Sequence, residues 1–269
     1  MPGVPFEMEA IMTEEVFPRL IKLGNQQSIV HKTILTLGLP ESTLAEKIEG
    51  WESALPEFVK LAYLPSALTV RLRLSAYGTD KAMLEAEIGK QVMELENIIP
   101  SYIFGFDDEN LALIIGRLLV KSSKTMAVAE SCTGGNIAHF ITSNAGSSAY
   151  FKGGIVAYSN EIKVKLLEVA SEIIETHGAV SQQVAEAMAV GAQKALNADY
   201  SIATTGIAGP DGGTADKPVG TIWIAVAGPS GVKSEKQIFR HNRERNIIRS
   251  TQTALNFLRK LILKDQSAK

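Results

Sequence analysis

The sequence predicts an α/β protein, in which a layered α/β sandwich with helices on both faces of its sheet follows a small α+β domain. Three observations lead to this prediction. Strand-like and helix-like segments alternate along the 269 residues, the strands after residue 107 are almost continuously apolar, and the polar run 107–110 separates two different patterns. Continuously apolar strands indicate a sheet that is covered on both faces.

Residues 20–106 are predicted to form the small α+β domain, and residues 1–19 a linker or the remnant of a preceding domain. Apolar and polar side chains alternate over 68–74, which indicates a sheet with one solvent-facing surface. The predicted elements are strand 28–39, helix 41–55, strands 59–65 and 66–78, helix 80–97 and strand 101–106.

Residues 107–269 are predicted to form the α/β sandwich. Acidic residues at 107–109 favour a helix start, and Ser181 is expected to cap a later helix. The link 171–180 is expected to be a polar connection. The predicted elements are helix 109–122, strand 125–131, helix 133–144, strand 153–159, helices 160–170 and 181–197, strands 200–209, 220–228 and 234–241, and a closing helix with Ile247, Ile248, Thr251, Leu255, Leu258 and Leu261 on one side.

Composition excludes several classes of protein. Lys plus Arg number 27 against 29 acidic residues, and the small domain has no G-x-x-G loop of the kind that clamps a nucleic-acid backbone, so nucleic acid is not an expected partner. One cysteine forms no intramolecular disulfide, which favours the cytoplasm. The apolar run 111–120 contains Arg117 and is too short to span a membrane. Four scattered histidines predict no metal site.

The sequence AESCTGGN lies where a strand passes into a helix, and ligands of open α/β sheets lie beyond such strand ends. Ser131 is expected to project from the sheet, with the backbone amides of Thr133, Gly134 and Gly135 free to bind an anion at the helix start. The alternative is that the glycines only allow a tight turn. Glu130 is expected on the opposite side, where it either accepts backbone N–H bonds or contacts a ligand.

Two further strand ends carry candidate residues. In AYSNEIK, Tyr158 ends a strand and Lys163 falls in the first turn of a helix, where the helix dipole and burial would both lower the pKa of the lysine. Such a lysine can be a general base, whereas the alternative is an exposed lysine. The loop TTGIAGPDGG brings backbone close to a ligand or is an irregular connection. Arg243 suits a phosphate, or belongs to a solvated charged surface.

The segments AESCTGG, GGIVAYSNEIKVKLL and TTGIAGPDGGTADKPVGTIWIA resemble, in order and spacing, the signature blocks of the CinA family of competence/damage-inducible proteins. In that family the C-terminal domain is a nicotinamide mononucleotide deamidase. Residues 20–105 resemble its small KH-like middle domain, and residues 2–8 resemble the end of its molybdopterin-binding-like N-terminal domain. The chain is therefore expected to be a truncated or fragmentary member, and the pyrophosphatase activity associated with the missing domain is not carried over.

The resemblance implies hydrolysis of nicotinamide mononucleotide to nicotinic acid mononucleotide and ammonia, in pyridine nucleotide salvage, without a metal or cofactor. It implies that Ser131 is the nucleophile, Lys163 its general base and Tyr158 a hydroxyl partner, so Lys163 Nζ should lie within hydrogen-bond distance of Ser131 Oγ. The implied substrate-binding residues are Glu130, Thr133, Gly134, Gly135, Thr205, Gly206, Gly209 and Arg243.

The resemblance also implies a homodimer with a small nucleotide as substrate, and the composition leads us to expect a cytoplasmic protein without a membrane partner. The alternative hypothesis is a catalytically inactive module that binds a nucleotide or a protein and is linked to competence or DNA repair. Intact Ser131, Tyr158 and Lys163 favour the enzyme, because an inactive module need not retain all three.

Overall fold

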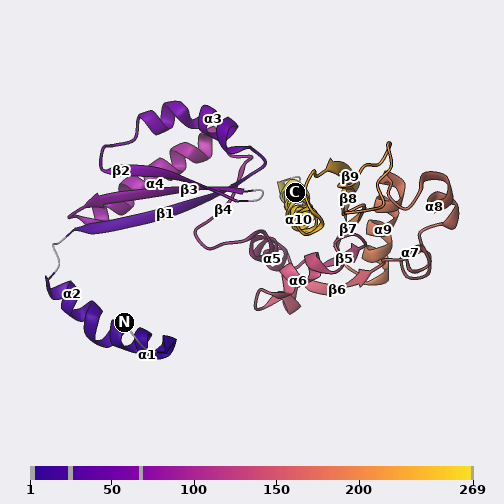
Figure 1. The fold of residues 1–269 in the computed structure, drawn as a ribbon, viewed down its shortest axis with the longest axis horizontal. Coiled ribbons are helices and arrows are strands. Elements are labelled where there is room, and N and C mark those ends of the chain that lie inside the picture. The colour runs from indigo at the N-terminus through magenta and orange to yellow at the C-terminus, as the bar shows by residue number, and fades with distance from the viewer. Residues whose placement is uncertain (1–3, 24–26, 67–68, 268–269) are drawn as a thin grey trace. The chain divides into compact units, whose positions relative to one another are not determined.

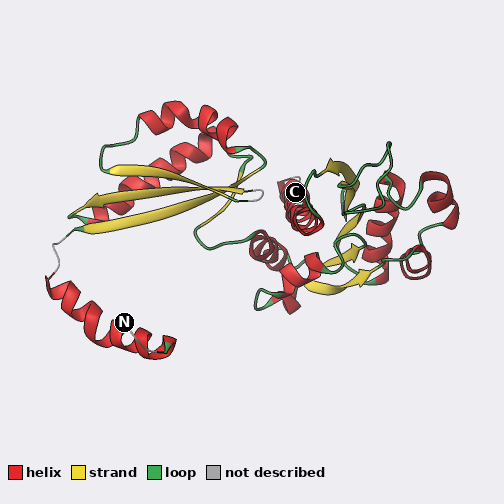
Figure 2. Cartoon of the chain, viewed as in Figure 1, coloured by secondary structure: helices red, strands yellow, loops and turns green. Residues whose placement is uncertain are grey.

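The computed structural model describes residues 4–23, 27–66 and 69–267. The chain divides into two compact units, Met1–Asp107 and Asp108–Lys269, and each unit is described separately (Figure 1). The mixed α/β fold class is confirmed, since each unit holds a sheet flanked by helices (Figure 2).

The first unit begins with a helical segment that the sequence analysis did not predict. Helix α1 (Pro5–Ile11), a π-helical turn (Met12–Val16) and α2 (Phe17–Leu23) follow one another directly. None of the side chains described in this segment is buried. Periodic burial is the main signal for a helix in a sequence, so an exposed helix gives little of it.

The rest of the first unit is an antiparallel sheet with strand order β2-β3-β1-β4. The elements follow the predicted order of strand, helix, two strands, helix and strand. They are β1 (Ser28–Leu37), α3 (Glu41–Ser53), β2 (Val59–Pro65), β3 (Thr69–Gly78), α4 (Lys81–Ile98) and β4 (Ile103–Phe106).

The predicted alternation on β3 is confirmed over its described residues. Val70, Leu72 and Leu74 are buried, whereas Arg71 and Arg73 are exposed. The buried set joins apolar residues of α3 and α4 in one core, which leaves the other face of the sheet in contact with solvent. Leu68, which the pattern also places inward, lies outside the described residues.

The second unit contains a five-stranded sheet with strand order β6-β5-β7-β8-β9. Strands β6, β5 and β7 are parallel, and β8 and β9 continue the sheet antiparallel. The strands are β5 (Met126–Glu130), β6 (Phe151–Val156), β7 (Tyr200–Gly206), β8 (Thr221–Gly228) and β9 (Gly231–Ile238).

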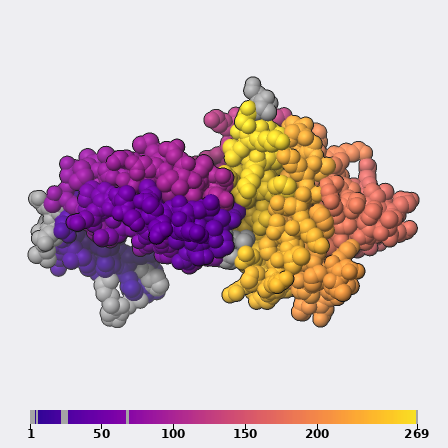
Figure 3. All heavy atoms as spheres, turned by 90° about the horizontal axis from the view of Figure 1, so that it is seen from above, coloured from indigo at the N-terminus to yellow at the C-terminus, as the bar shows by residue number. Residues whose placement is uncertain are grey.

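Helices cover both faces of this sheet, as predicted. Figure 1 shows α5, α6 and α10 on one side of the sheet and α7, α8 and α9 on the other. One side of α10 stays exposed, and its last turns lie at the surface in yellow in Figure 3. The helices are α5 (Leu111–Lys121), α6 (Asn136–Thr142), α7 (Asn160–Leu167), α8 (Ser171–His177), α9 (Gln182–Ala195) and α10 (Arg243–Ser267).

Two elements of this unit differ from the sequence analysis. The link 171–180, expected to be a polar connection, contains helix α8, whose seven residues include no buried side chain. Helix α6 begins at Asn136 and not at Thr133, because Gly134 and Gly135 adopt left-handed conformations with φ of 63° and 97°. These two glycines extend the turn after β5 before the helix can start.

Helix α9 packs closely against the end of α7, and Gly191 permits this approach. A Cβ atom at residue 191 would lie 2.0 Å from the carbonyl oxygen of Leu167, the last residue of α7. Both elements have backbone at this contact, so neither side can relieve the overlap by changing a rotamer. The position of α7 therefore depends on the missing side chain of Gly191.

We predict that Gly191→Ala lowers the free energy of unfolding of the second unit by at least about 2 kcal/mol, because the new methyl group overlaps backbone. Gly50→Ala in α3 is the control, since a Cβ there meets no atom within 4 Å. The control should raise the stability of the first unit by about 0.5–1 kcal/mol. Urea unfolding measures both changes, and equal effects of the two substitutions would contradict this account.

Candidate active site

A cavity of about 240 Å³ lies in the second unit, next to the carboxyl ends of β5 and β7. This is the position at which open α/β sheets bind ligands. The residues that line it come from the turn after β5, the start of α7, the segment before α9, the loop after β7 and the start of α10. They are Ser131, Cys132, Tyr158, Asn160, Lys163, Ala179, Val180, Thr205, Gly206, Ala208 and Arg243.

Ser131 follows the last residue of β5 and faces this cavity. Its amide donates to the carbonyl of Thr204 at 2.9 Å, which ties the serine to the neighbouring strand β7. Its carbonyl accepts from the Gly134 amide at 3.1 Å, which closes the turn. Ser131 is therefore held by backbone on both sides, with its hydroxyl beside α7.

Glu130 lies on the other side of β5 and is completely buried. Its carboxylate accepts the backbone amides of Gly135 at 3.1 Å, Ile137 at 3.0 Å and Ala138 at 2.8 Å. The N-terminus of α6 therefore holds an anion that belongs to the protein itself. Glu130 was expected either to accept backbone N–H bonds or to contact a ligand, and in the structure it accepts backbone N–H bonds.

These contacts correct the expectation of free amides behind Ser131. The Gly134 amide donates to Ser131 and the Gly135 amide to Glu130, so neither is free to bind a substrate. The Thr133 hydroxyl is buried and lies 2.7 Å from that of Thr204. Glu130, Thr133, Gly134 and Gly135 thus support the turn and do not line the cavity.

Lys163 extends from α7 to Ser131 and is only 2% exposed. Ser159 caps α7 by accepting the Ile162 amide, which fixes the first turn on which the lysine stands. Lys163 Nζ lies 3.2 Å from Ser131 Oγ, 2.9 Å from the carbonyl oxygen of Ala157 and 3.3 Å from that of Tyr158. The expected distance between the lysine and serine side chains is present.

Burial lowers the pKa of Lys163, because removal from water penalises the charged ammonium form. The two carbonyl oxygens can only accept, so they take two N–H groups of the lysine. In a neutral amine the remaining position is a lone pair, and the remaining neighbour is the Ser131 hydroxyl. The arrangement therefore suits proton transfer from Ser131 to Lys163.

Cys132 also lines the cavity, but its thiol is unsuited to nucleophilic attack. Burial raises its pKa to about 12 and the carboxylate of Glu130 adds to that effect, so the reactive thiolate is scarce at neutral pH. Among the described residues no group of three or more His, Cys, Asp or Glu side chains could hold a metal ion. The chemistry available here is that of the serine and lysine.

Tyr158 and Arg243 form the outer part of the cavity. The Tyr158 side chain is 63% exposed, and its hydroxyl accepts from Arg243 Nη2 at 3.3 Å. Arg243 Nη1 donates to the carbonyl of Gly209 at 2.8 Å. The tyrosine hydroxyl thus bonds to the arginine, whereas the tyrosine backbone carbonyl contacts Lys163.

The end of β7 and the glycine-rich loop after it both line the cavity. Thr205 is buried, and its hydroxyl donates to the carbonyl of Ala179 at 2.7 Å. A Cβ at Gly206 would lie 2.7 Å from the Thr221 carbonyl oxygen, so only glycine fits at this strand end. The structure brings together six predicted residues in the lining, namely Ser131, Tyr158, Lys163, Thr205, Gly206 and Arg243.

Sequence reasoning missed several lining residues, of which Asn160 is the most polar. It is the first residue of α7 and stands three positions before Lys163, a spacing that places both on the same side of the helix. That spacing was a usable signal. Ala179, Val180 and Ala208 line the cavity through small or apolar groups that no sequence pattern distinguished.

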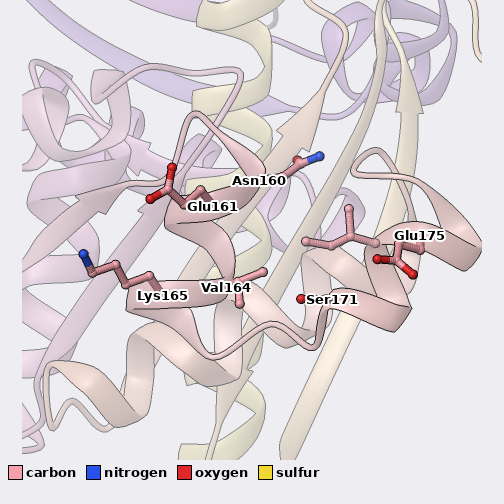
Figure 4. Close-up of a pocket in the computed structure, with 7 residues that line it drawn as sticks. Asn160, Glu161, Val164, Lys165, Ser171 and Glu175 are labelled. Carbon is pink, nitrogen blue, oxygen red and sulfur yellow. The ribbon is translucent and has the colours of Figure 1, made fainter.

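A second cavity, of about 440 Å³, lies between α7 and α8 (Figure 4). Asn160 lines both cavities, whereas Val164 and Glu175 line only this one. The second cavity is larger but contains neither the serine nor the buried lysine. Volume alone would favour this second cavity, whereas the paired Ser131 and Lys163 side chains make the first cavity the candidate site.

Residues 108–262 match the family profile described as the CinA C-terminal domain, and residues 31–105 match that of the Damage-inducible protein CinA KH domain. The chain belongs to the CinA family. A CinA-like protein of Flavobacterium psychrophilum is 51% identical over 268 residues, covering 99% of this chain and 64% of the relative. One of Cytophaga hutchinsonii is 46% identical over 260 residues, covering 97% of this chain and 62% of the relative. The chain thus spans less than two thirds of these relatives.

Solved structures of the CinA family match more than half of this chain. The competence/damage inducible protein CihA of Agrobacterium tumefaciens has a TM-score of 0.55 and 40% identity, over 56% of this chain and 93% of that one. A CinA superfamily protein of Escherichia coli has a TM-score of 0.55 and 33% identity, over 57% of this chain and 89% of that one. These likenesses confirm the family and the fold, and their names state no reaction. In the described residues no helix is long and apolar enough to cross a membrane.

We predict that Glu130→Gln lowers the free energy of unfolding of the second unit by about 2–3 kcal/mol, since the buried turn loses a charged acceptor and one acceptor oxygen. Glu175→Gln, on the exposed side of α8, is the control and should change it by less than about 0.5 kcal/mol. Chemical denaturation measures both variants. A Glu130→Gln variant as stable as the control would show that the carboxylate does not anchor α6.

Proposed function

We propose that the second unit is a metal-independent amidohydrolase that converts nicotinamide mononucleotide and water to nicotinic acid mononucleotide and ammonia. The observation that carries the proposal is the buried Lys163 amine, 3.2 Å from the Ser131 hydroxyl, in a cavity whose other end holds Arg243. Membership of the CinA family, which includes amidohydrolases, supports the reaction class.

In the proposed first step, Ser131 Oγ attacks the carboxamide carbon while Lys163 takes the hydroxyl proton. The C–N bond of the tetrahedral intermediate then breaks, and the Lys163 ammonium gives its proton to the departing nitrogen, which leaves as ammonia. An ester between Ser131 and the nicotinoyl group remains. Water attacks this ester while Lys163 takes one of its protons. The C–O bond then breaks as the Lys163 ammonium gives that proton to Ser131 Oγ, which releases the acid and regenerates the serine and the neutral lysine.

The outer part of the cavity would bind the nucleotide. Arg243 donates one N–H to the carbonyl of Gly209 and one to the hydroxyl of Tyr158. With these two bonds to described residues made, three of its five N–H donors remain for a phosphate. Ala208 lines the cavity, so its backbone amide is a candidate donor to the oxyanion or the phosphate. The Tyr158 hydroxyl would hold Arg243 in place. In the proton transfer, Tyr158 would take part only through its backbone carbonyl, which accepts a hydrogen bond from Lys163.

We predict that the purified chain releases ammonia from nicotinamide mononucleotide, at equal rates with and without EDTA. Ser131→Ala should lower kcat by about 10³-fold or more, because the covalent route is lost. Cys132→Ala should keep most of the activity, since the thiol is protonated. Unchanged turnover in Ser131→Ala would contradict the proposal, and an inactive wild-type chain would favour the alternative, a binding module.

The pH dependence tests the role of Lys163. Only the neutral amine accepts a proton, so kcat/KM should fall as pH drops through the pKa of Lys163. Burial lowers this pKa, so the midpoint should lie below the ordinary lysine value of about 10.4. Lys163→Met should abolish turnover, whereas Lys165→Met, an exposed lysine of the same helix, should keep the profile. A midpoint at or above 10.4 would contradict a lysine base.

A further inference from the structure

Asn246 lies in the first turn of α10 and is completely buried. Its Nδ2 donates to the carbonyl of Ala208 at 3.0 Å and to that of His241 at 2.9 Å, and its Oδ1 accepts the His241 amide at 3.3 Å. Every partner is backbone. The orientation of the amide is fixed, because the reverse orientation would set its oxygen against two carbonyl oxygens.

These bonds join two segments that form the outer part of the cavity. Ala208 belongs to the glycine-rich loop and lines the cavity, and His241 precedes the helix that begins at Arg243. Arg243 makes a second bond to the same loop, at Gly209. The side chain of Arg243 is long and exposed, so it can follow a moving loop, whereas the short buried amide of Asn246 cannot.

Asn246 therefore determines where Arg243 stands relative to the backbone of Ala208 and Gly209. Loss of the amide would leave the Ala208 and His241 carbonyls without their donor inside the protein. Such groups regain a hydrogen bond only by moving toward water, which would move the loop away from α10. Ser131 and Lys163 stand on β5 and α7 and have no bond to Asn246, so they would stay in place.

We propose that Asn246 is a positioning residue for the phosphate end of the substrate. It acts by holding Arg243 and the 208–209 backbone at the spacing that binds a phosphate. This inference rests on the proposed function for its substrate. It predicts a defect in the binding of a phosphate-bearing ligand, without a matching defect for a ligand that lacks phosphate.

The test uses the full chain in two assays. In the first, Asn246→Leu, which keeps about the size of the side chain and its lack of charge but has no N–H donor, is compared with wild type on nicotinamide mononucleotide. We expect KM to rise about tenfold and kcat to change less than about threefold, as one buried hydrogen-bond network is lost. In the second, calorimetry measures binding of the mononucleotide and of nicotinamide riboside to Ser131→Ala chains, with and without Asn246→Leu.

The calorimetric affinity for the mononucleotide should fall about tenfold, and that for the riboside should stay within about twofold. Asn256→Leu is the matched control, because Asn256 is a buried asparagine farther along the same helix, bonded to Arg259 and not to the loop. The control should lower stability and leave the ratio of the two affinities unchanged. Asn246→Leu and Arg243→Ala should also be non-additive in the mononucleotide affinity.

Equal losses of affinity for both ligands, a fall in kcat alone, or the same change of ratio in Asn256→Leu would overturn the positioning role. Failure of the proposed function is a separate result. It would appear as a wild-type chain that hydrolyses neither ligand, while the calorimetric ratio still tests Asn246. A Ser131→Ala chain that binds neither ligand would overturn both proposals.

Discussion

The candidate site depends on one constraint: an amine that is removed from water must find all its partners within the protein. Lys163 meets this constraint with the carbonyls of Ala157 and Tyr158, at the end of the segment that follows β6, and with the hydroxyl of Ser131. The cost of burying a charge makes the neutral amine easier to populate. The same burial that holds the side chain in place therefore also prepares it to accept a proton.

The two sides of β5 carry side chains with different roles. Glu130 faces α6 and supplies an anion to the N-terminus of this helix, and the next residue, the proposed nucleophile Ser131, faces the cavity. Successive strand residues point to opposite faces, so the carboxylate and the hydroxyl are separated by the sheet itself. The negative charge of Glu130 is therefore bound by backbone amides at the start of α6, on the side of β5 away from the cavity.

Local patterns in the sequence predicted most of the fold and the centre of the site. The apolar strands, the Ser181 cap and the AYSNEIK segment each act over a few residues, so β7, α9 and the place of Lys163 were readable. The role of Glu130 needed the exact start of α6, which two left-handed glycines shift by three residues. Helix α8 and the helix before residue 24 bury no described side chain and so gave no periodic signal. The bond from Asn246 to Ala208 spans 38 positions, and no local pattern predicts it.

The order of the site residues along the chain has a consequence for biosynthesis. Ser131 and Lys163, the proposed nucleophile and base, come from segments made early in the second unit, whereas Arg243 begins its last helix, α10. A nascent chain in which β5 and α7 have formed has the serine–lysine pair but no clamp for the far end of a ligand. The cavity is complete only once α10 has left the ribosome and docked between α5 and β8. Any activity that needs Arg243 would therefore require that synthesis and folding have reached α10.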